Sequence, residues 1–173
     1  MNLKELFLSK GYDYYKTDKQ THHNYLQTYH ELFCKWEKEN INILEVGCYK
    51  NGSLKLWEEY FVNANIIIGY DVRTYDGDVQ LNRAKVIIED FYSSKRELPP
   101  LHIALDDGDH SVPSQLAFIR KVYPYVVSGG IIVVEDVMPN FKQHFDSLNI
   151  PYTAIAFYPP TDQEDDRIII IRK

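Results

Sequence analysis

Residues 41–52, INILEVGCYKNG, decide the fold class of this chain. The stretch begins as a run of apolar, partly β-branched residues, which is typical of a strand that is covered on both faces. The chain then turns at Gly47, and apolar residues recur at helical spacing over 52–61. Glycine at such a turn lets the backbone approach a ligand, and the first turn of the helix offers unpaired N–H groups. A glycine that only makes the turn would look the same, so the other strand ends decide between the two interpretations.

The same strand-then-helix pattern continues along the chain. Further apolar runs close on acidic residues, and amphipathic segments separate them, which predicts a parallel sheet with helices as the connections. The predicted strands lie at 41–47, 65–71, 101–107 and 129–136, with a weaker one at 85–90, and the helical segments lie at 52–61 and 113–126.

The pattern changes after Asp136. A helix is expected around 139–147, and two strands at 152–158 and 167–173, joined by the polar stretch 159–166, predict a hairpin at the C-terminal edge of the sheet. We therefore expect an α/β, doubly wound, Rossmann-like fold with a mostly parallel seven-stranded sheet and an antiparallel C-terminal hairpin. Residues 1–40 are expected to form a helical cap segment of the same domain, and 41–173 form its core.

Composition excludes several classes of function. The chain has 173 residues, a formal net charge of −6 and a pI near 5.5, so it lacks the clustered positive charge that nucleic acid binding needs. No apolar run approaches the length of a membrane span, and the N-terminus lacks the features of a signal peptide. The default location is the cytoplasm. The two cysteines, Cys34 and Cys48, have no CxxC spacing and are expected to be buried and reduced.

Acidic residues at three successive strand ends predict a nucleoside site. Asp71 ends the second strand about two dozen residues after the glycine turn, where a carboxylate can accept both ribose hydroxyls. The weaker strand ends in Glu89-Asp90-Phe91, which places an acid and an aromatic ring where an adenine would lie. The joint placement favours an adenosyl ligand over three solvated strand ends.

A second acidic group predicts a metal site. Asp106-Asp107-Gly108-Asp109-His110 follows one strand and Glu135-Asp136 follows its neighbour, so these carboxylates converge and repel unless a cation is present. Oxygen ligands without cysteine favour Mg²⁺, with Mn²⁺ or Ca²⁺ as alternatives, over zinc. His110 beside this group is the candidate general base, because histidine ordinarily titrates near neutral pH.

These segments resemble the metal-dependent sugar O-methyltransferases of macrolide and aromatic polyketide biosynthesis, the mycinamicin and tetracenomycin (macrocin-type) tailoring enzymes. The resemblance is carried by TDK (17–19), ILEVGCYKNGSLKLWEEYF (43–61), IIGYDV (67–72), LDDGDH (105–110) and IIVVEDV (131–137). Most members have serine where this chain has Asp109.

The resemblance implies the class I methyltransferase fold and S-adenosylmethionine (SAM) as methyl donor. Asp107, Glu135 and Asp136 would ligate Mg²⁺ or Mn²⁺, with Asp107 and His110 catalytic. His23 is a further candidate contact on the donor side. The candidate donor-binding residues are Thr17, Lys19, Glu45, Gly47, Cys48, Ser53, Asp71, Val72, Glu89, Asp90, Phe91 and Asp106.

The resemblance also implies the reaction. The cation would bind two neighbouring hydroxyls of the acceptor and lower the pKa of one, and His110 would remove its proton for in-line methyl transfer. The expected partner is therefore a sugar or glycan with a vicinal diol, such as a deoxyhexose like rhamnose. A catechol-type acceptor and a non-catalytic SAM-binding module of a larger glycan-synthesising protein are the alternatives. A homo-oligomer and a place in a longer multidomain chain both stay open.

Overall fold

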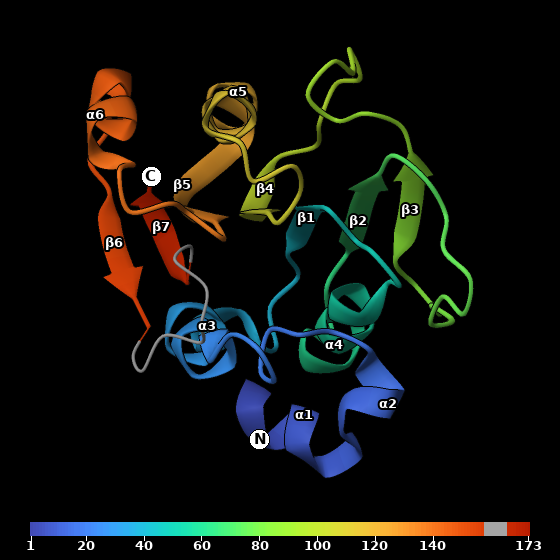
Figure 1. Ribbon diagram of the computed structural model, residues 1–173. Coiled ribbons are helices and arrows are strands. Elements are labelled where there is room, and N and C mark those ends of the chain that lie inside the picture. Colours follow the sequence, from blue (N-terminus) through green and yellow to red (C-terminus); the bar gives the residue numbers. More distant parts are fainter. Residues whose placement is uncertain (158–165) are drawn as a thin grey trace.

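The predicted sheet is present in the computed structural model, which describes residues 1–157 and 166–173 (Figure 1). Among these residues the sheet has seven strands in the order β3-β2-β1-β4-β5-β7-β6. Strands β1 to β5 pair in parallel, and β7 runs antiparallel to both β5 and β6. The predicted connection at 159–166 lies, apart from Asp166, outside the described residues. The strands are β1 Asn42–Val46, β2 Ile66–Asp71, β3 Lys85–Ile88, β4 Leu101–Asp106, β5 Val126–Val134, β6 Thr153–Ala156 and β7 Arg167–Arg172.

Helices cover both faces of the sheet. Figure 1 shows α1, α3 and α4 on one side and α5 and α6 on the other. No described helix has the length and apolar character that crossing a bilayer requires. The helices are α1 Leu3–Lys10, α2 Tyr12–Tyr15, α3 Tyr25–Phe33, α4 Gly52–Tyr60, α5 Val112–Val122 and α6 Lys142–Phe145, with short 3₁₀ turns at Cys34–Trp36, Tyr123–Tyr125 and Asp146–Leu148.

The helix expected around 139–147 is shorter than predicted. Only α6 is α-helical, and a 3₁₀ turn replaces the last part of the expected helix. Ser147 Oγ donates a hydrogen bond of 2.5 Å to the carbonyl of His144, and such a side-chain contact competes with helical pairing of the backbone. Asn149 then ends the segment in a left-handed conformation.

Alternate residues of the central strands pack into two separate cores, one on each face of the sheet. Both faces are buried, and for this reason the strand sequences are apolar without interruption. In β1, Ile43 packs into the core under α1, α3 and α4, whereas Leu44 packs into the core under α5 and α6. The same alternation holds in β7, where Ile168 and Ile169 face opposite cores. Full burial of each such side chain stabilises the fold by roughly 1.5–3 kcal/mol.

The N-terminal helices pack through aromatic rings. Tyr29 and Phe33 of α3 contact Trp57 of α4 at ring-centroid distances of 6.0 and 6.2 Å, and all three rings are fully buried. This packing holds α3 beside α4, and the segment 16–24 that precedes α3 therefore lies at the carboxyl edge of the sheet.

Of the two cysteines, Cys48 is buried as expected, but the expectation for Cys34 is wrong: it lies in the 3₁₀ turn after α3 and is exposed.

The turn at Gly47 brings the ends of β1 and β4 into direct contact. The amide of Gly47 donates to the carbonyl of Tyr70 at 2.9 Å, and the amide of Asp107 donates to the carbonyl of Val46 at 2.8 Å. Gly47 has a φ of +83°, and a Cβ there would lie 1.9 Å from the carbonyl oxygen of Asp107. This close approach, which places Asp107, allows only glycine at position 47.

We predict that Gly47→Ala destabilises the protein much more than Gly129→Ala. Both glycines have φ near +80°, but a Cβ at Gly129 would meet nothing within 4 Å. Gly129→Ala should cost about 1–2 kcal/mol for the left-handed backbone alone, and Gly47→Ala about 1–3 kcal/mol more for the collision. Equilibrium urea denaturation measures both free energies of unfolding. Equal losses in the two variants would show that the close approach of β1 and β4 is easily relaxed.

Candidate active site

A cavity of about 440 Å³ opens at the carboxyl edge of the parallel strands. Segments that follow β1, β2, β3 and β4 line it, together with residues of 12–18 from the N-terminal segment. Such a volume is typical of a small-molecule site. Most residues predicted from the sequence line this cavity: Thr17, Gly47, Cys48, Ser53, Asp71, Val72, Glu89, Asp90, Phe91, Asp107, His110 and Asp136. Lys19, Glu45, Asp106 and Glu135 are not among the lining residues and are buried.

Asp71 fixes the glycine turn from the neighbouring strand. Its Oδ2 accepts hydrogen bonds from the backbone amides of Cys48 at 3.0 Å and Tyr49 at 2.9 Å. Tyr49 has a φ of +43°, a backbone conformation that a non-glycine residue adopts only when its surroundings hold it there. Asp71 Oδ1 accepts a longer bond of 3.3 Å from the Tyr75 hydroxyl. The carboxylate is therefore oriented by its own chain before any ligand binds.

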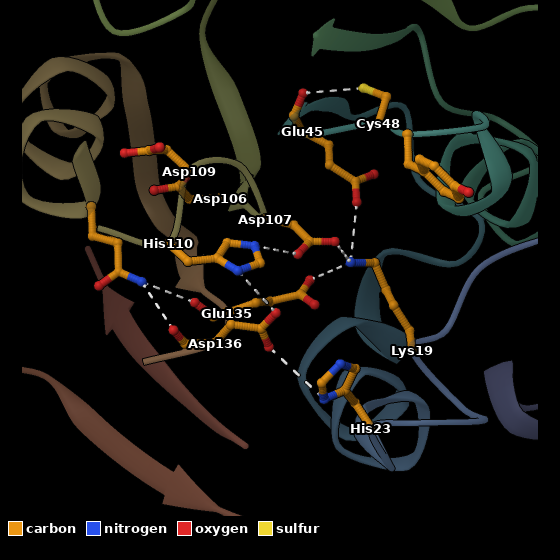
Figure 2. Close-up of polar contacts among 12 residues, drawn as sticks. Lys19, His23, Glu45, Cys48, Asp106, Asp107, Asp109, His110, Glu135 and Asp136 are labelled. Carbon is orange, nitrogen blue, oxygen red and sulfur yellow. Dashed lines mark hydrogen bonds and ion pairs between the residues drawn. The ribbon is translucent and has the colours of Figure 1, made fainter. Parts of the chain in front are cut away.

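His110 lies between two carboxylates from neighbouring strand ends (Figure 2). Its Nε2 is 3.4 Å from Asp107 Oδ1, and its Nδ1 is 3.5 Å from Asp136 Oδ2. Both His110 and Asp136 have positive φ values, +58° and +53°. The side-chain amide of Gln115 in α5 donates to the backbone carbonyl of Asp136 at 3.3 Å, and the hydroxyl of Tyr25 in α3 donates to Asp136 Oδ1 at 2.8 Å. Contacts from both faces of the sheet thus hold this strained turn.

The two carboxylates change how His110 titrates. The hydrogen bond to Asp107, together with the charges of Asp107 and Asp136, raises the pKa of His110 to about 9. The sequence interpretation, an imidazole that titrates near neutral pH, therefore does not hold for the cation-free site. Burial raises the pKa of Asp136, and the charge of Asp107 raises it further.

A second set of carboxylates surrounds the buried ammonium of Lys19 (Figure 2). Lys19 Nζ lies 2.7 Å from Asp107 Oδ2, 2.6 Å from Glu135 Oε1 and 3.3 Å from Glu45 Oε1. Glu45 Oε2 accepts a hydrogen bond of 2.6 Å from the indole of Trp57. Burial raises the pKa of Asp107, but Lys19 and His110 outweigh it and hold this pKa below its usual value.

Among the described residues, two groups of side chains have the proximity that a cation site needs. Asp107, His110 and Asp136 offer ligand atoms that lie within 4.8 Å of one another, and so do Glu45, Asp107 and Glu135. The structure therefore brings Asp107 and Asp136 of the predicted metal ligands together with His110. The carboxylate of Glu135 lies in the other group, hydrogen-bonded to Lys19. Asp107 is shared, with one oxygen facing each group.

Several tyrosines that were not among the predicted site residues also line the cavity. Tyr12, Tyr49, Tyr75 and Tyr92 all contribute to its wall. Tyr92 donates to Asp106 Oδ1 at 2.8 Å, and burial raises the pKa of Asp106 to about 7. The position of Tyr92, two residues after the strand-end Asp90, is a signal that could have identified it. Tyr12 carries no such signal, because it is distant in sequence from every strand end.

We predict that Asp107→Asn lowers the pKa of His110 from about 9 toward its ordinary value of 6.5 in cation-free protein. The reason is the loss of the carboxylate that makes the largest contribution to the shift. The imidazole NMR signals of His110, followed against pH, measure this directly, and His102 is the internal control because burial alone lowers its pKa. Since the folded-state pKa of His110 is raised, its protonation stabilises the wild-type fold fully below about pH 6.5, and this stabilisation is lost as pH rises through about 9. An unchanged His110 titration in the variant would contradict this assignment.

Known proteins resemble this chain in sequence over part of their length. No protein-family model matches the chain. It is 25% identical over 142 residues to the 8-demethyl-8-alpha-L-rhamnosyl tetracenomycin-C 2'-O-methyltransferase of Streptomyces olivaceus, an alignment that covers 75% of this chain and 37% of the relative. It is 27% identical over 133 residues to the mycinamicin VI 2''-O-methyltransferase of Micromonospora griseorubida, covering 66% of this chain and 32% of the relative. The chain thus spans about a third of the length of these relatives.

A solved structure shares the fold of this chain over its full length. The MycE methyltransferase from the mycinamycin biosynthetic pathway, in complex with Mg, SAH and mycinamycin VI, superposes with a TM-score of 0.77 at 20% identity, covering 100% of this chain and 54% of that one. An rRNA methylase from Streptococcus thermophilus gives a TM-score of 0.62 at 8% identity, covering 84% of this chain and 94% of that one. The chain has the class I methyltransferase fold and resembles in sequence the sugar O-methyltransferases of the tetracenomycin and mycinamicin pathways.

Proposed function

We propose that this chain is a SAM-dependent O-methyltransferase that uses a divalent cation to methylate a sugar hydroxyl. The proposal rests on the set of residues that line a single cavity. The same cavity is lined by Gly47, Asp71 and Asp90 at the ends of the first three strands and by Asp107 and Asp136 at the ends of β4 and β5. A nucleoside donor site and a carboxylate pair therefore share one space, as transfer of a group from donor to acceptor requires.

The donor side of the cavity fits an adenosyl group. The backbone at Gly47 carries no side chain, and Asp71 is preoriented by the amides of Cys48 and Tyr49. A carboxylate at the end of the second strand is where ribose hydroxyls bind in doubly wound sheets. Phe91, which is 2% exposed, contributes an aromatic surface beside Asp90. The names of the relatives and of the MycE complex support SAM as the donor.

The acceptor side fits a divalent cation. Asp107 and Asp136 would hold it, since their carboxylate oxygens are hard ligands that already converge on one point near His110. Glu135, the remaining predicted ligand, has its Oε1 engaged by the ammonium of Lys19. When bound, the cation would supply a positive charge that lowers the pKa of an acceptor hydroxyl.

His110 is the residue placed to accept the proton of that hydroxyl. Only the neutral imidazole can do so, and a cation that shares the charge of Asp107 and Asp136 would lower the pKa of His110 and favour that form. Without that charge, the pKa near 9 keeps the ring protonated at neutral pH. This dependence makes the base available only when the acidic pair is engaged.

A sugar with neighbouring hydroxyls is the proposed acceptor. One relative is named as a 2'-O-methyltransferase of a rhamnosyl tetracenomycin and another as a 2''-O-methyltransferase of mycinamicin VI, which supports this class. Tyrosines such as Tyr12 and Tyr92 in the cavity wall offer flat rings with polar edges, which suit the faces of a sugar ring.

The proposal is tested by incubating the protein with isotopically labelled SAM and a panel of acceptors, with and without EDTA. We expect label transfer to a rhamnoside or another glycoside with a vicinal diol, weaker transfer to a catechol, and loss of transfer after chelation. Added Mg²⁺ or Mn²⁺ should restore it. Full activity after exhaustive chelation would remove the cation from the proposal, and preferential labelling of the catechol would replace the sugar acceptor.

We predict that His110→Ala lowers the turnover rate by about 10²–10⁴-fold, the usual contribution of a general base. Donor affinity, measured by calorimetry with S-adenosylhomocysteine, should change little, and the acidic limb of the pH–rate profile should flatten. His144→Ala is the matched control, since His144 in α6 does not line the cavity. A His110→Ala variant with wild-type turnover and pH profile would show that the cation alone activates the hydroxyl.

A further inference from the structure

The ammonium of Lys19 is enclosed at the carboxyl edge of the sheet in a way that a solvated lysine is not. Its side chain is 1% exposed, and the three nearest acids, Glu45, Asp107 and Glu135, come from the ends of three adjacent strands. Removing a lysine from water is costly unless opposite charges surround it. Three carboxylates around one ammonium make Lys19 the central cation of this group.

One carboxylate oxygen in the group is left without a hydrogen bond. Glu45 is fully buried, and its Oε1 has no hydrogen-bond partner among the described residues. The cation that faces this oxygen is Lys19 Nζ, at 3.3 Å. Three carboxylates whose oxygens lie within 4.8 Å of one another, one of them unbonded, form a set of ligands that would suit a divalent cation if the ammonium were absent.

The formal charges of the side chains at this edge add up to a net negative charge that one divalent cation would neutralise. The carboxylates of Glu45, Asp107, Glu135 and Asp136 face the ammonium of Lys19 and the imidazole of His110. In the cation-free site, with both nitrogen groups positive, two formal negative charges remain uncompensated, which is the charge that a single divalent cation neutralises. Without Lys19, three formal negative charges would remain, which is one more than a single divalent cation neutralises.

We propose that Lys19 is a built-in cation that occupies a second metal site, so that the protein binds one divalent ion at Asp107 and Asp136 and none at Glu45 and Glu135. Lys19 thereby acts as a positioning residue. It draws Asp107 Oδ2 and Glu135 Oε1 toward itself and leaves Asp107 Oδ1 directed at the site beside His110. It also ties the segment 16–24, which borders the cavity through Thr17 and Asp18, to the strand ends. The proposal rests on the cation site of the proposed function.

The experiment counts bound Mn²⁺ per chain in the wild type and in Lys19→Met, by equilibrium dialysis with electron paramagnetic resonance of the free ion. Methionine keeps the length of the side chain and removes its charge. We expect about one Mn²⁺ in the wild type and a gain of about one in the variant. Lys10→Met is the matched control, because Lys10 pairs with Glu59 at 2.7 Å on the surface, and its loss should leave the count unchanged.

The outcomes separate this inference from the proposed function. One Mn²⁺ in both proteins, or two in the wild type, would overturn the role of Lys19 and leave the cation requirement standing. None in the wild type and one in Lys19→Met would support Lys19 as the occupant and contradict the cation requirement. None in either protein would contradict both.

Thermal melting covers the case in which the variant is unstable. Lys19→Met should melt below the wild type without cation, and Mn²⁺ should raise its melting temperature more than that of the wild type, because two ions bind the folded state instead of one. If the variant is unfolded with and without Mn²⁺, Lys19→Gln, which is neutral but polar and keeps all three carboxylates, takes its place. A melting temperature that rises with Mn²⁺ no more than in the wild type would then overturn the proposal.

Discussion

The structure depends most on how positive charge compensates the negative carboxylates that the parallel strands bring together at one edge of the sheet. Strands β1, β4 and β5 are adjacent, and each has an acid at or next to its carboxyl end, so these side chains converge within a few ångströms. Converging carboxylates in a dry environment repel, and burial raises the pKa of Glu45 and of Glu135. Lys19 supplies the positive charge from a segment outside the sheet. The N-terminal segment is therefore bound to the site by electrostatics as well as by the aromatic packing of α3.

The acidic edge is divided into two halves. Asp107 is the common member, with one oxygen hydrogen-bonded to Lys19 and the other facing His110. The half around Lys19 is closed and does not line the cavity, whereas the half around His110 does. One half therefore provides rigidity and the other remains available for ligands. The hydrogen bond to Asp107 and the charges of Asp107 and Asp136 also raise the pKa of His110.

Backbone strain is concentrated at the same edge. Gly47, Tyr49, His110 and Asp136 all have positive φ values, and each lies directly after a strand or in the turn that follows one. Such conformations persist only where surrounding contacts hold them. Here the contacts come from neighbouring strand ends and from helices on both faces, such as the bond from Gln115 in α5. The sheet provides the fixed framework on which these turns are held in place for function.

The sequence by itself determined the sheet, because continuous apolar runs can be buried only when both faces are covered, and it determined which acids stand at the strand ends. Gly47, Asp71, Asp90, Asp107 and Asp136 could all be found in this way, since their place follows from where a strand stops. The boundaries of the helix near 142–148 could not, because a local side-chain bond outweighed the pattern. Only the tertiary structure decided that Lys19 enters the acidic edge and that Glu135 faces it rather than Asp136. That pairing joins residues more than a hundred positions apart in the chain, and it depends on how α3 packs, which no local pattern of residues records.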